Sequence, residues 1–382
     1  MASSARVLSS PGFRDEFAKR GGESAARCYQ CATCSSVCEL APAEAPFPRR
    51  QMLWAQWGLM DRLAADPSVW LCHQCNDCNV RCPRDAQPGD VMQTLRAMVV
   101  ERLAFPSFLG KLVGSVRFTW PVLVGVPIAF WFVLVAISNG FAVPGVHGES
   151  SFVEGRFHYD SFIPHGLIYA VYFPVAAWVA LAAWVSGRRF WTLLGSRGAR
   201  RSGSFLGKLV PALVEIAAHT RFASCSGQAQ RRWGHFGVLW GFVGAAVTSG
   251  LLVVYLYGFD MYPLPLTHWV KWLGNISAVL LVVGGAMLLL NRIKADRQSG
   301  SSTAFDSFFL GIVLAVIATG VLTEAGRFLF DPVMACAVYV VHLGVVLSLF
   351  LTFPYSKFAH LLYRTLAMVH QLMVTPAKEG GA

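Results

Sequence analysis

Two runs of cysteine near the N-terminus have a spacing that suits iron–sulfur chemistry. Eight of the ten cysteines follow the pattern C-x2-C-x2-C-x3-C twice, and they are Cys28, Cys31, Cys34, Cys38, Cys72, Cys75, Cys78 and Cys82. Three cysteines three residues apart can bind three corners of a [4Fe-4S] cube, while the fourth, one residue further on, binds the other cube. The sequence therefore predicts two clusters, each completed by the last cysteine of the other run.

This exchange assigns a cluster to every cysteine of the two runs. The first cluster is predicted to bind Cys28, Cys31, Cys34 and Cys82, and the second to bind Cys72, Cys75, Cys78 and Cys38. Zinc and disulfides are the alternatives. Structural zinc sites use separated C-x2-C pairs or mixtures of cysteine and histidine, which these runs do not resemble. Disulfides need an oxidising compartment, and residues 1–27 contain no apolar signal-peptide core.

Histidines at the ends of apolar stretches predict a second kind of cofactor. His342 and His360 are eighteen residues apart, which is five whole turns of a helix and places both imidazoles on one face, about 27 Å apart along the axis. Pro354 lies between them and should kink that helix. His235 begins another apolar stretch at the depth of His360, so we predict that these two residues hold haem b between their imidazoles.

His342 needs a different partner at its own depth. The candidates are His165 and His268, of which His165 is favoured, and a haem held by His342 alone is the other possibility. An isolated histidine can also simply hydrogen-bond to the backbone. Glu324 either pairs with Arg327, three residues later, or handles the protons of a quinone.

The elements that position these residues mostly span a membrane. Of the 382 residues, 55% are hydrophobic and only 14% are charged, unlike the composition of a soluble chain. Six apolar stretches reach the length of roughly 20 residues that crosses a bilayer, and they cover residues 118–138, 163–186, 235–257, 268–291, 306–328 and 333–355. We therefore predict a mainly α fold, with a two-cluster ferredoxin-like domain at 1–104 and a six-span cytochrome b domain at 105–382.

The charge distribution indicates the orientation. Basic residues exceed acidic ones by eleven and gather beside apolar stretches, which favours positive-inside loops over nucleic-acid binding. The strongly basic loop 188–233 is predicted to be cytoplasmic, with an amphipathic helix at 205–222, and His219 and Cys225 are expected at its surface. The loop 139–162 is predicted to lie outside. Both termini and the cluster domain are then cytoplasmic, in a bacterial or archaeal inner membrane. Two further helices are expected, one at 48–65 and one that Asp90 caps and that ends near Leu103.

These features resemble a known group of redox proteins over about residues 25–375. The segment 49–84, with RRQMLWAQWGLMDRL and WLCHQCNDCNVRCPR, resembles the C subunit of heterodisulfide reductase. The six-span part resembles the E subunit and, more distantly, the cytochrome b subunit of respiratory nitrate reductase. The union of both parts in one chain is similar to the C subunit of the quinone-interacting membrane-bound oxidoreductase complex.

The resemblance implies ligands, partners and an electron path. His235, within HFGVLWGFVG, matches the first haem ligand of the nitrate reductase pattern, and His342 with His360 match the pair on its last span. Ala245 departs from the pattern, because it occupies the place of a second histidine, and the ligation of the second haem stays open. The resemblance further implies electron exchange between menaquinone and cytoplasmic flavin and iron–sulfur subunits similar to heterodisulfide reductase A, which serve adenylylsulfate reductase in dissimilatory sulfur metabolism. The alternatives are a membrane module of a heterodisulfide reductase and a redox-sensing membrane anchor.

Overall fold

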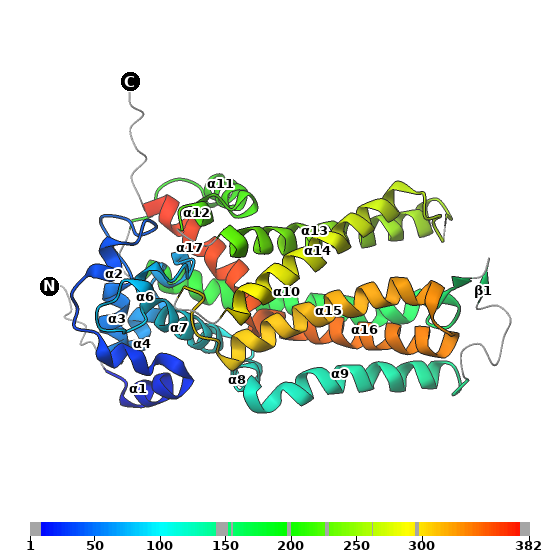
Figure 1. Ribbon diagram of the computed structural model, residues 1–382, viewed down its shortest axis with the longest axis horizontal. Helices are drawn as coiled ribbons and strands as arrows, with labels where there is room; N and C mark the ends of the chain where they lie inside the picture. Colours follow the sequence, from blue (N-terminus) through cyan, green and yellow to red (C-terminus); the bar gives the residue numbers. More distant parts are fainter. Residues whose placement is uncertain are drawn as a thin grey trace, which may run out of the picture.

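A computed structural model describes residues 9–142, 152–153, 156–196, 200–225, 229–261, 263–294 and 298–374. Its short helices gather at one end of the molecule and its long helices run away from them side by side (Figure 1). The mainly α fold predicted from the sequence is confirmed. Residues 143–151 and 154–155 of the loop expected on the outer side lie outside the described residues.

The N-terminal part consists of short helices joined by tight loops. Its elements are α1 (Pro11–Phe17), η1 (Ala18–Gly22), η2 (Glu23–Arg27), α2 (Thr33–Ser36), α3 (Arg49–Gln56), α4 (Met60–Ala64), α5 (Ser68–Leu71), α6 (Asp77–Val80), α7 (Pro88–Leu103) and α8 (Ser107–Gly114). The single helix expected at 48–65 is two helices, because Gly58 has a φ of 69° and ends the first. Asp90 does not cap α7, which begins at Pro88; its carboxylate instead accepts a hydrogen bond from the Ser301 amide.

Among the residues that the structure describes, six helices are long and apolar enough to span a membrane, as predicted. They are α9 (Val116–Ser138), α10 (His165–Gly195), α13 (Ala229–Gly258), α14 (Trp269–Ile293), α15 (Ala304–Leu329) and α16 (Pro332–Thr352). Apolar side chains such as Phe118, Phe173 and Trp272 are 61–80% exposed on these helices. Such surfaces suit a lipid environment, where the helical backbone satisfies its own hydrogen bonds.

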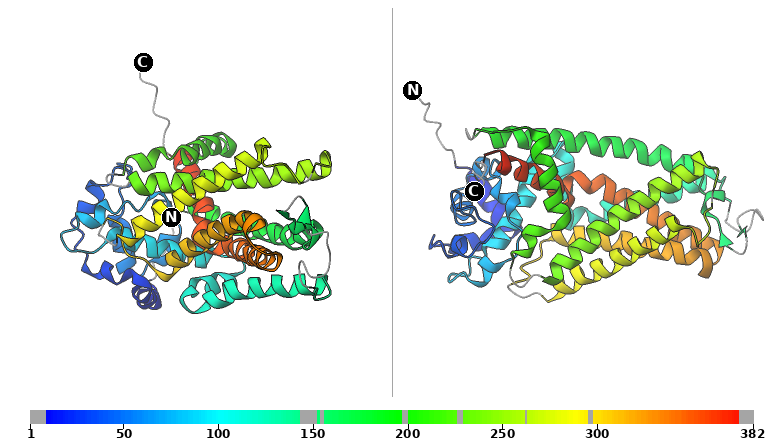
Figure 2. Two further views of the ribbon diagram at one scale, coloured as in Figure 1. Left: turned by 45° about the vertical axis from the view of Figure 1, so that its right-hand side comes forward. Right: turned by 90° about the horizontal axis from the view of Figure 1, so that it is seen from above.

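The α13 and α14 helices form a close antiparallel pair (Figure 2). A Cβ atom on Gly237 would lie 3.1 Å from the Leu280 carbonyl oxygen, and one on Gly234 would lie 3.1 Å from that of Gly284. Small residues let two membrane helices approach to backbone contact. His235 is therefore carried by a helix that is held firmly against its neighbour.

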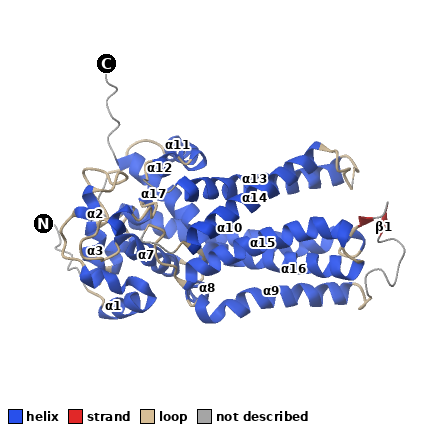
Figure 3. Cartoon of the chain, viewed as in Figure 1, coloured by secondary structure: helices blue, strands red, loops and turns tan. Residues whose placement is uncertain are grey.

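The basic segment and the last helix lie at the same end as the N-terminal part. They form α11 (Phe205–Ala218), α12 (Thr220–Ala223) and α17 (His360–Val374), whereas the hairpin β1 (Phe152–Val153) to β2 (Arg156–Phe157) lies at the far end (Figure 3). The helix expected at 205–222 is broken at His219, whose φ is 55°. The prediction that His219 and Cys225 lie at the surface is wrong, because they are only 7% and 8% exposed.

His342 and His360 do not share one helix. The α16 helix ends at Thr352, and two 3-10 turns, η5 (Phe353–Tyr355) and η6 (Lys357–Ala359), precede α17, which begins at His360. Pro354 and the extended backbone of Ser356 interrupt the helical hydrogen bonds here. The prediction that both histidines lie on one helix, five turns apart with a kink at Pro354, is therefore wrong.

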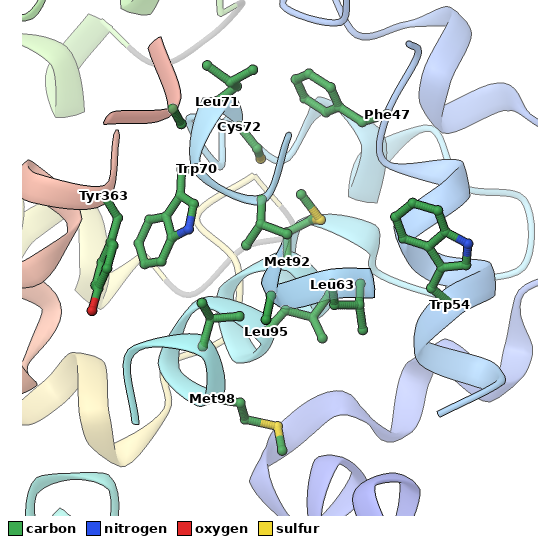
Figure 4. Close-up of a cluster of buried hydrophobic side chains, with 14 of the residues drawn as sticks. Phe47, Trp54, Leu63, Trp70, Leu71, Cys72, Met92, Leu95, Met98 and Tyr363 are labelled. Atoms are coloured by element: carbon green, nitrogen blue, oxygen red, sulfur yellow. The ribbon is translucent and has the colours of Figure 1, made fainter. Parts of the chain in front are cut away.

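One hydrophobic core joins the N-terminal part to the membrane part. Trp70 of α5 stacks on Tyr363 of α17 with ring centres 4.7 Å apart, and Phe190 of α10 meets Tyr363 edge-on at 5.3 Å. Figure 4 shows Trp70 beside Tyr363, with Leu71 and Cys72 following it in the chain. The second cysteine run is thus anchored directly on the helix that carries His360.

Candidate cofactor sites

The two cysteine runs adopt the same backbone conformation. Gln30 and Ala32 in the first run, and Gln74 and Asn76 at the equivalent places in the second, all have φ between 54° and 71°. A one-turn helix then follows in each, α2 and α6. Left-handed residues turn successive backbone amides toward one side of a loop, which creates a concave site for a negatively charged group. Each run is therefore a preformed anion-binding loop.

Backbone amides in these loops point at cysteine sulfurs. The Gln30 amide lies 3.4 Å from Cys28 Sγ, and the Gln74 amide lies 3.3 Å from Cys72 Sγ. The Ala86 amide lies 3.3 Å from Cys82 Sγ. Hydrogen bonds to cluster sulfurs are one of the ways in which proteins tune [4Fe-4S] centres. The loops and their donors therefore fit [4Fe-4S] clusters.

The structure brings the first predicted group of cysteines to one cavity and places Cys38 beside the second run. A small cavity is lined by the first group, Cys28, Cys31, Cys34 and Cys82. Burial and then the nearby Cys28 thiol raise the pKa of Cys34 to about 11. Burial and then Cys72 likewise raise the pKa of Cys38 to about 11, so Cys38 lies beside the second run. Buried cysteines with such a raised pKa become thiolates when a metal ion binds to them.

Cys225 is a further cysteine at the second site, and the sequence analysis missed it. Its side chain lies next to that of Cys75. The two residues are 150 positions apart in the chain, and nothing in their spacing indicates a contact. The basic segment therefore reaches the second cysteine loop directly.

His235 and His360 lie beside each other at a spacing that would suit one metal ion between them. Their ring centres are 6.1 Å apart with planes at 73°. A metal–imidazole bond is about 2 Å long and the ring centre lies about 1 Å beyond the nitrogen, so two imidazoles on opposite sides of one metal have centres about 6 Å apart. The spacing of the two rings would suit two histidines that hold one haem.

Hydrogen bonds leave the Nε2 atom of each histidine available for iron. His360 Nδ1 donates to the Lys357 carbonyl oxygen. His235 Nδ1 lies 2.7 Å from Nε2 of His219, whose own Nδ1 lies 3.4 Å from the Ala217 carbonyl oxygen. A carbonyl oxygen only accepts, so His219 Nδ1 donates to Ala217. His219 Nε2 is then the acceptor of the hydrogen bond that His235 Nδ1 donates. A hydrogen bond at Nδ1 orients an imidazole that binds a metal through Nε2. His219 is therefore a positioning residue that the sequence analysis missed.

A single cavity of about 1230 Å³ contains both histidines and extends from the second cysteine loop into the membrane part. His73 and Gln74 line its end near the cluster loop, and His342 and Tyr339 lie in its wall further along the spans. Pockets for single small ligands occupy about 300–1000 Å³. The cavity is therefore large enough for more than one such group.

The remaining predicted residues are placed differently. His342 lines the cavity, with Nδ1 2.9 Å from Thr319 Oγ1. Neither His165 nor Glu324 is among the residues that line it. His165 stacks on Tyr169, and Glu324 lies 3.7 Å from both Lys271 and Arg327. The structure therefore brings His342 to the cavity of His235 and His360 but does not bring His165 there with it.

Comparisons with known proteins match both parts of the chain. Residues 126–380 match the family model of citrate utilization protein B, and residues 24–86 match the 4Fe-4S dicluster domain. The chain is 26% identical to citrate utilization protein B of Escherichia coli over an alignment that covers 90% of this chain and 88% of that protein. No solved structure matches the chain.

The N-terminal part also matches archaeal proteins. It is 34% identical over 104 residues to the C subunit of the H(2):CoB-CoM heterodisulfide,ferredoxin reductase of Methanothermobacter thermautotrophicus, covering 27% of this chain and 55% of that protein. It is 36% identical over 88 residues to a protein of Archaeoglobus profundus that is like the C subunit of heterodisulfide reductase, covering 23% and 47%. The chain thus spans about half the length of these archaeal relatives. The resemblance of the N-terminal part to the C subunit of heterodisulfide reductase is confirmed.

Proposed function

The chain belongs to the citrate utilization protein B family, and on this premise we propose that it is an electron-transfer subunit that links a membrane quinone to soluble redox subunits. Its 4Fe-4S dicluster domain and its oxidoreductase relatives establish the redox role. Haem b and the quinone belong to the proposal. They are supported by the paired histidines and by the cavity.

The observation that carries this proposal is the continuity of one cavity between the cysteine loop and the spans. His73 and Gln74, next to Cys72, border the same cavity as His235, His360 and His342. Electron carriers must lie close together, and a cavity that extends from the cysteine loop into the spans provides room for this arrangement. A membrane anchor without electron transfer needs no such cavity.

The side chains have separate tasks in this arrangement. Haem b and the [4Fe-4S] clusters, when bound, each accept and release one electron at a time. The cluster at the first cysteine loop, farther from the proposed haem, is called the outer cluster, and we assign to it Cys28, Cys31, Cys34 and Cys82. The cluster at the second loop, next to the proposed haem, is called the inner cluster, and its ligands are Cys38, Cys72, Cys75 and Cys78. The His235 and His360 imidazoles present Nε2 to the haem, and the Lys357 carbonyl and His219 hold them in place.

The quinone is proposed to bind in the part of the cavity that His342 lines. Apolar side chains such as Val321 and Val346 surround it there, which suits a quinone ring and its tail. His342, within hydrogen-bond reach of Thr319, is the nearest candidate for moving the quinone's protons. A role for Glu324, and a second haem between His342 and His165, remain predictions that depend on a rearrangement at the outer end.

The orientation is proposed from charge. The cluster loops and the basic segment lie at the same end of the bundle (Figure 1), and basic loops stay on the cytoplasmic side. We therefore propose that the clusters, both termini and α17 face the cytoplasm of a bacterium or archaeon. We also propose a division at residue 104 into a cluster domain and a membrane domain.

Three kinds of soluble partner are candidates. The resemblance to the C subunit of the quinone-interacting complex favours flavin and iron–sulfur subunits like heterodisulfide reductase A, with adenylylsulfate reductase beyond them. Citrate utilization protein B of Escherichia coli, which aligns with almost the whole chain, favours by its name a partner in citrate utilization. The heterodisulfide reductase relatives favour a reductase of that class. Purification of the intact complex followed by identification of its subunits distinguishes these three.

The haem is tested by the absorption spectrum of the purified protein. The dithionite-reduced minus oxidised spectrum should show the α-band of low-spin haem b, and His360→Ala should abolish it. His268→Ala is the matched control, because His268 is absent from the cavity wall. Its side chain is the N-cap of α14 and accepts a hydrogen bond from the Val270 amide. An unchanged spectrum in the His360 variant would contradict the proposed ligation.

The quinone link is tested by adding a quinol to the protein in liposomes. The haem band should become reduced without dithionite, and His342→Phe, which fills the cavity and removes the imidazole, should slow this reduction at least tenfold. Equal rates in the variant and the native protein would contradict the assigned quinone position.

A further inference from the structure

Three arginines converge on the second cysteine loop from three different helices. Arg96 of α7 donates from Nε to the Val69 carbonyl oxygen at 2.7 Å and from Nη2 to that of Cys72 at 2.6 Å. Arg364 of α17 donates to the carbonyl oxygens of Trp70 at 3.0 Å and Cys72 at 2.9 Å. The backbone just before Cys75 is thus held from two sides.

Arg231 of α13 completes the set. Its guanidinium donates to the carbonyl oxygens of Gln74 and His73, the latter at 3.1 Å. A guanidinium is a planar fork with five donors, which allows one side chain to hold two carbonyls at once. The five consecutive residues from Trp70 to Gln74 therefore include four whose carbonyls accept from these arginines.

Two of the arginines lie one turn from the haem histidines. Arg231 precedes His235 by four residues, and Arg364 follows His360 by four. Residues four apart share a helix face, and all four side chains line the same cavity. The three guanidinium groups therefore occupy the space between the second cysteine loop and the proposed haem.

These positive charges have no carboxylate partner among the described residues. Neighbouring cations do: Arg221 pairs with Glu215, and Arg292 lies 4.0 Å from Asp306. A guanidinium stays protonated in proteins, so each of the three side chains carries a full positive charge. Concentrated positive charge in an enclosed site requires a compensating anion.

The cluster itself supplies that anion. Four thiolates around an oxidised [4Fe-4S] core give a net negative charge, and one added electron makes the site more negative by one charge without any proton. A nearby positive charge stabilises the more negative state, so it favours reduction. The first cysteine loop has no such set of arginine–carbonyl bonds among the described residues.

Resting on the proposed function, we infer that Arg96, Arg231 and Arg364 form a three-arginine clamp that fixes the second cysteine loop beside the haem and raises the reduction potential of its cluster. Electrons then collect at the cluster nearest the membrane cofactors. These arginines are positioning residues, since they act on the cluster through its loop and its charge.

The test is a dithionite titration of the full-length protein monitored by EPR. The inner signal is identified as the one lost in Cys78→Ala. Each of R96Q, R231Q and R364Q should shift the inner midpoint to more negative potential and leave the outer midpoint in place. Arg189→Gln is the matched control, because Arg189 also donates to two carbonyls, those of Leu103 and Ala104, away from the loop. It should leave both midpoints unchanged.

Lysine variants separate charge from geometry. Arg364→Lys keeps the charge but not the fork, so its inner midpoint should stay near the native value. Unchanged inner midpoints in all three glutamine variants would overturn the inference. If the glutamine variants lose the inner cluster, retention in Arg364→Lys supports the electrostatic role, and loss in both overturns it. An absent haem band in the same samples would contradict the proposed function alone, because the two cluster midpoints are read independently of it.

Discussion

The two cysteine loops have the same backbone and opposite surroundings. The first loop is open to solvent: Cys31 is exposed and Tyr29 is 69% exposed, with Arg84 stacked on its ring at 4.1 Å. The second loop lies under α7, α13 and α17, and Trp70 before it is 2% exposed. The same loop backbone thus occupies two different environments, and exposure and hydrogen bonding would set the reduction potential of a cluster bound in each.

The largest expected effect comes from the cysteines exchanged between the loops. Cys38→Ala should remove the inner cluster although Cys38 belongs to the first run, and Cys82→Ala should remove the outer one. Each variant should lose about half of the iron, because each cluster needs its fourth thiolate. Iron analysis and EPR measure this.

Cys336→Ala is the control for both, because Cys336 is 4% exposed inside a span and away from the loops. If Cys38→Ala removed the outer signal instead, each run would hold its own cluster and the exchange would be wrong.

Replacing the aromatic residue beside each loop should affect the stability of the protein very differently. Trp70→Ala removes a buried ring that packs on Tyr363 and Phe190, and we expect a loss of about 3–5 kcal/mol in the free energy of unfolding. Tyr29→Ala, at the exposed loop, should change it by less than about 0.5 kcal/mol. Thermal unfolding in detergent measures both. Equal losses would show that the first loop is also buried, for example by a partner.

The packing behind the inner loop predicts a smaller cost. A methyl group on Gly89 would collide with the Asn76 side chain, which is 1% exposed and donates to the Gln298 carbonyl oxygen at 3.0 Å. Gly89→Ala should therefore destabilise the protein by about 1–3 kcal/mol. Gly12→Ala is the control, since its methyl group would meet no atom within 4 Å. A neutral Gly89 variant would mean that the inner loop yields easily.

The helix that supports the inner loop should make stability depend on pH. Burial and then Arg201 lower the pKa of His370 on α17 to about 4. Below pH 6.5 the unfolded chain binds a proton that the folded chain refuses, so stability falls as the pH falls from 6.5 toward 4. By pH 5 the loss from this residue is at most about 2 kcal/mol. His370→Gln should flatten the curve relative to His268→Gln, and parallel curves would contradict this assignment.

Much of the fold and part of the candidate site could be predicted. Six spans follow from apolar length, because a bilayer has a fixed thickness, and each begins and ends within about ten residues of its expected limits. The pairing of His235 with His360 was predicted from their common depth, and the two ring centres lie 6.1 Å apart. The single helix expected from His342 to His360, with a kink at Pro354, was wrong, because Pro354 and Ser356 end it.

Other contacts could not be predicted because they join distant parts of the chain. His219 reaches His235, and Cys225 reaches Cys75, only because the αL residue His219 turns α12 back over the cluster loop. The four-residue spacing of Arg231 from His235 and of Arg364 from His360 was visible in the sequence. Its meaning depends on α7, α13 and α17 meeting at one loop.

The sequence by itself determined the cysteine spacing, the backbone of each cysteine loop and the number of spans. These features depend on the types and number of residues that are close together in the sequence. The tertiary structure alone decided that one loop faces solvent while the other faces the paired histidines and three arginines. That difference arises from the packing of Trp70 on Tyr363 and from long-range hydrogen bonds, in which the partners are up to 294 residues apart.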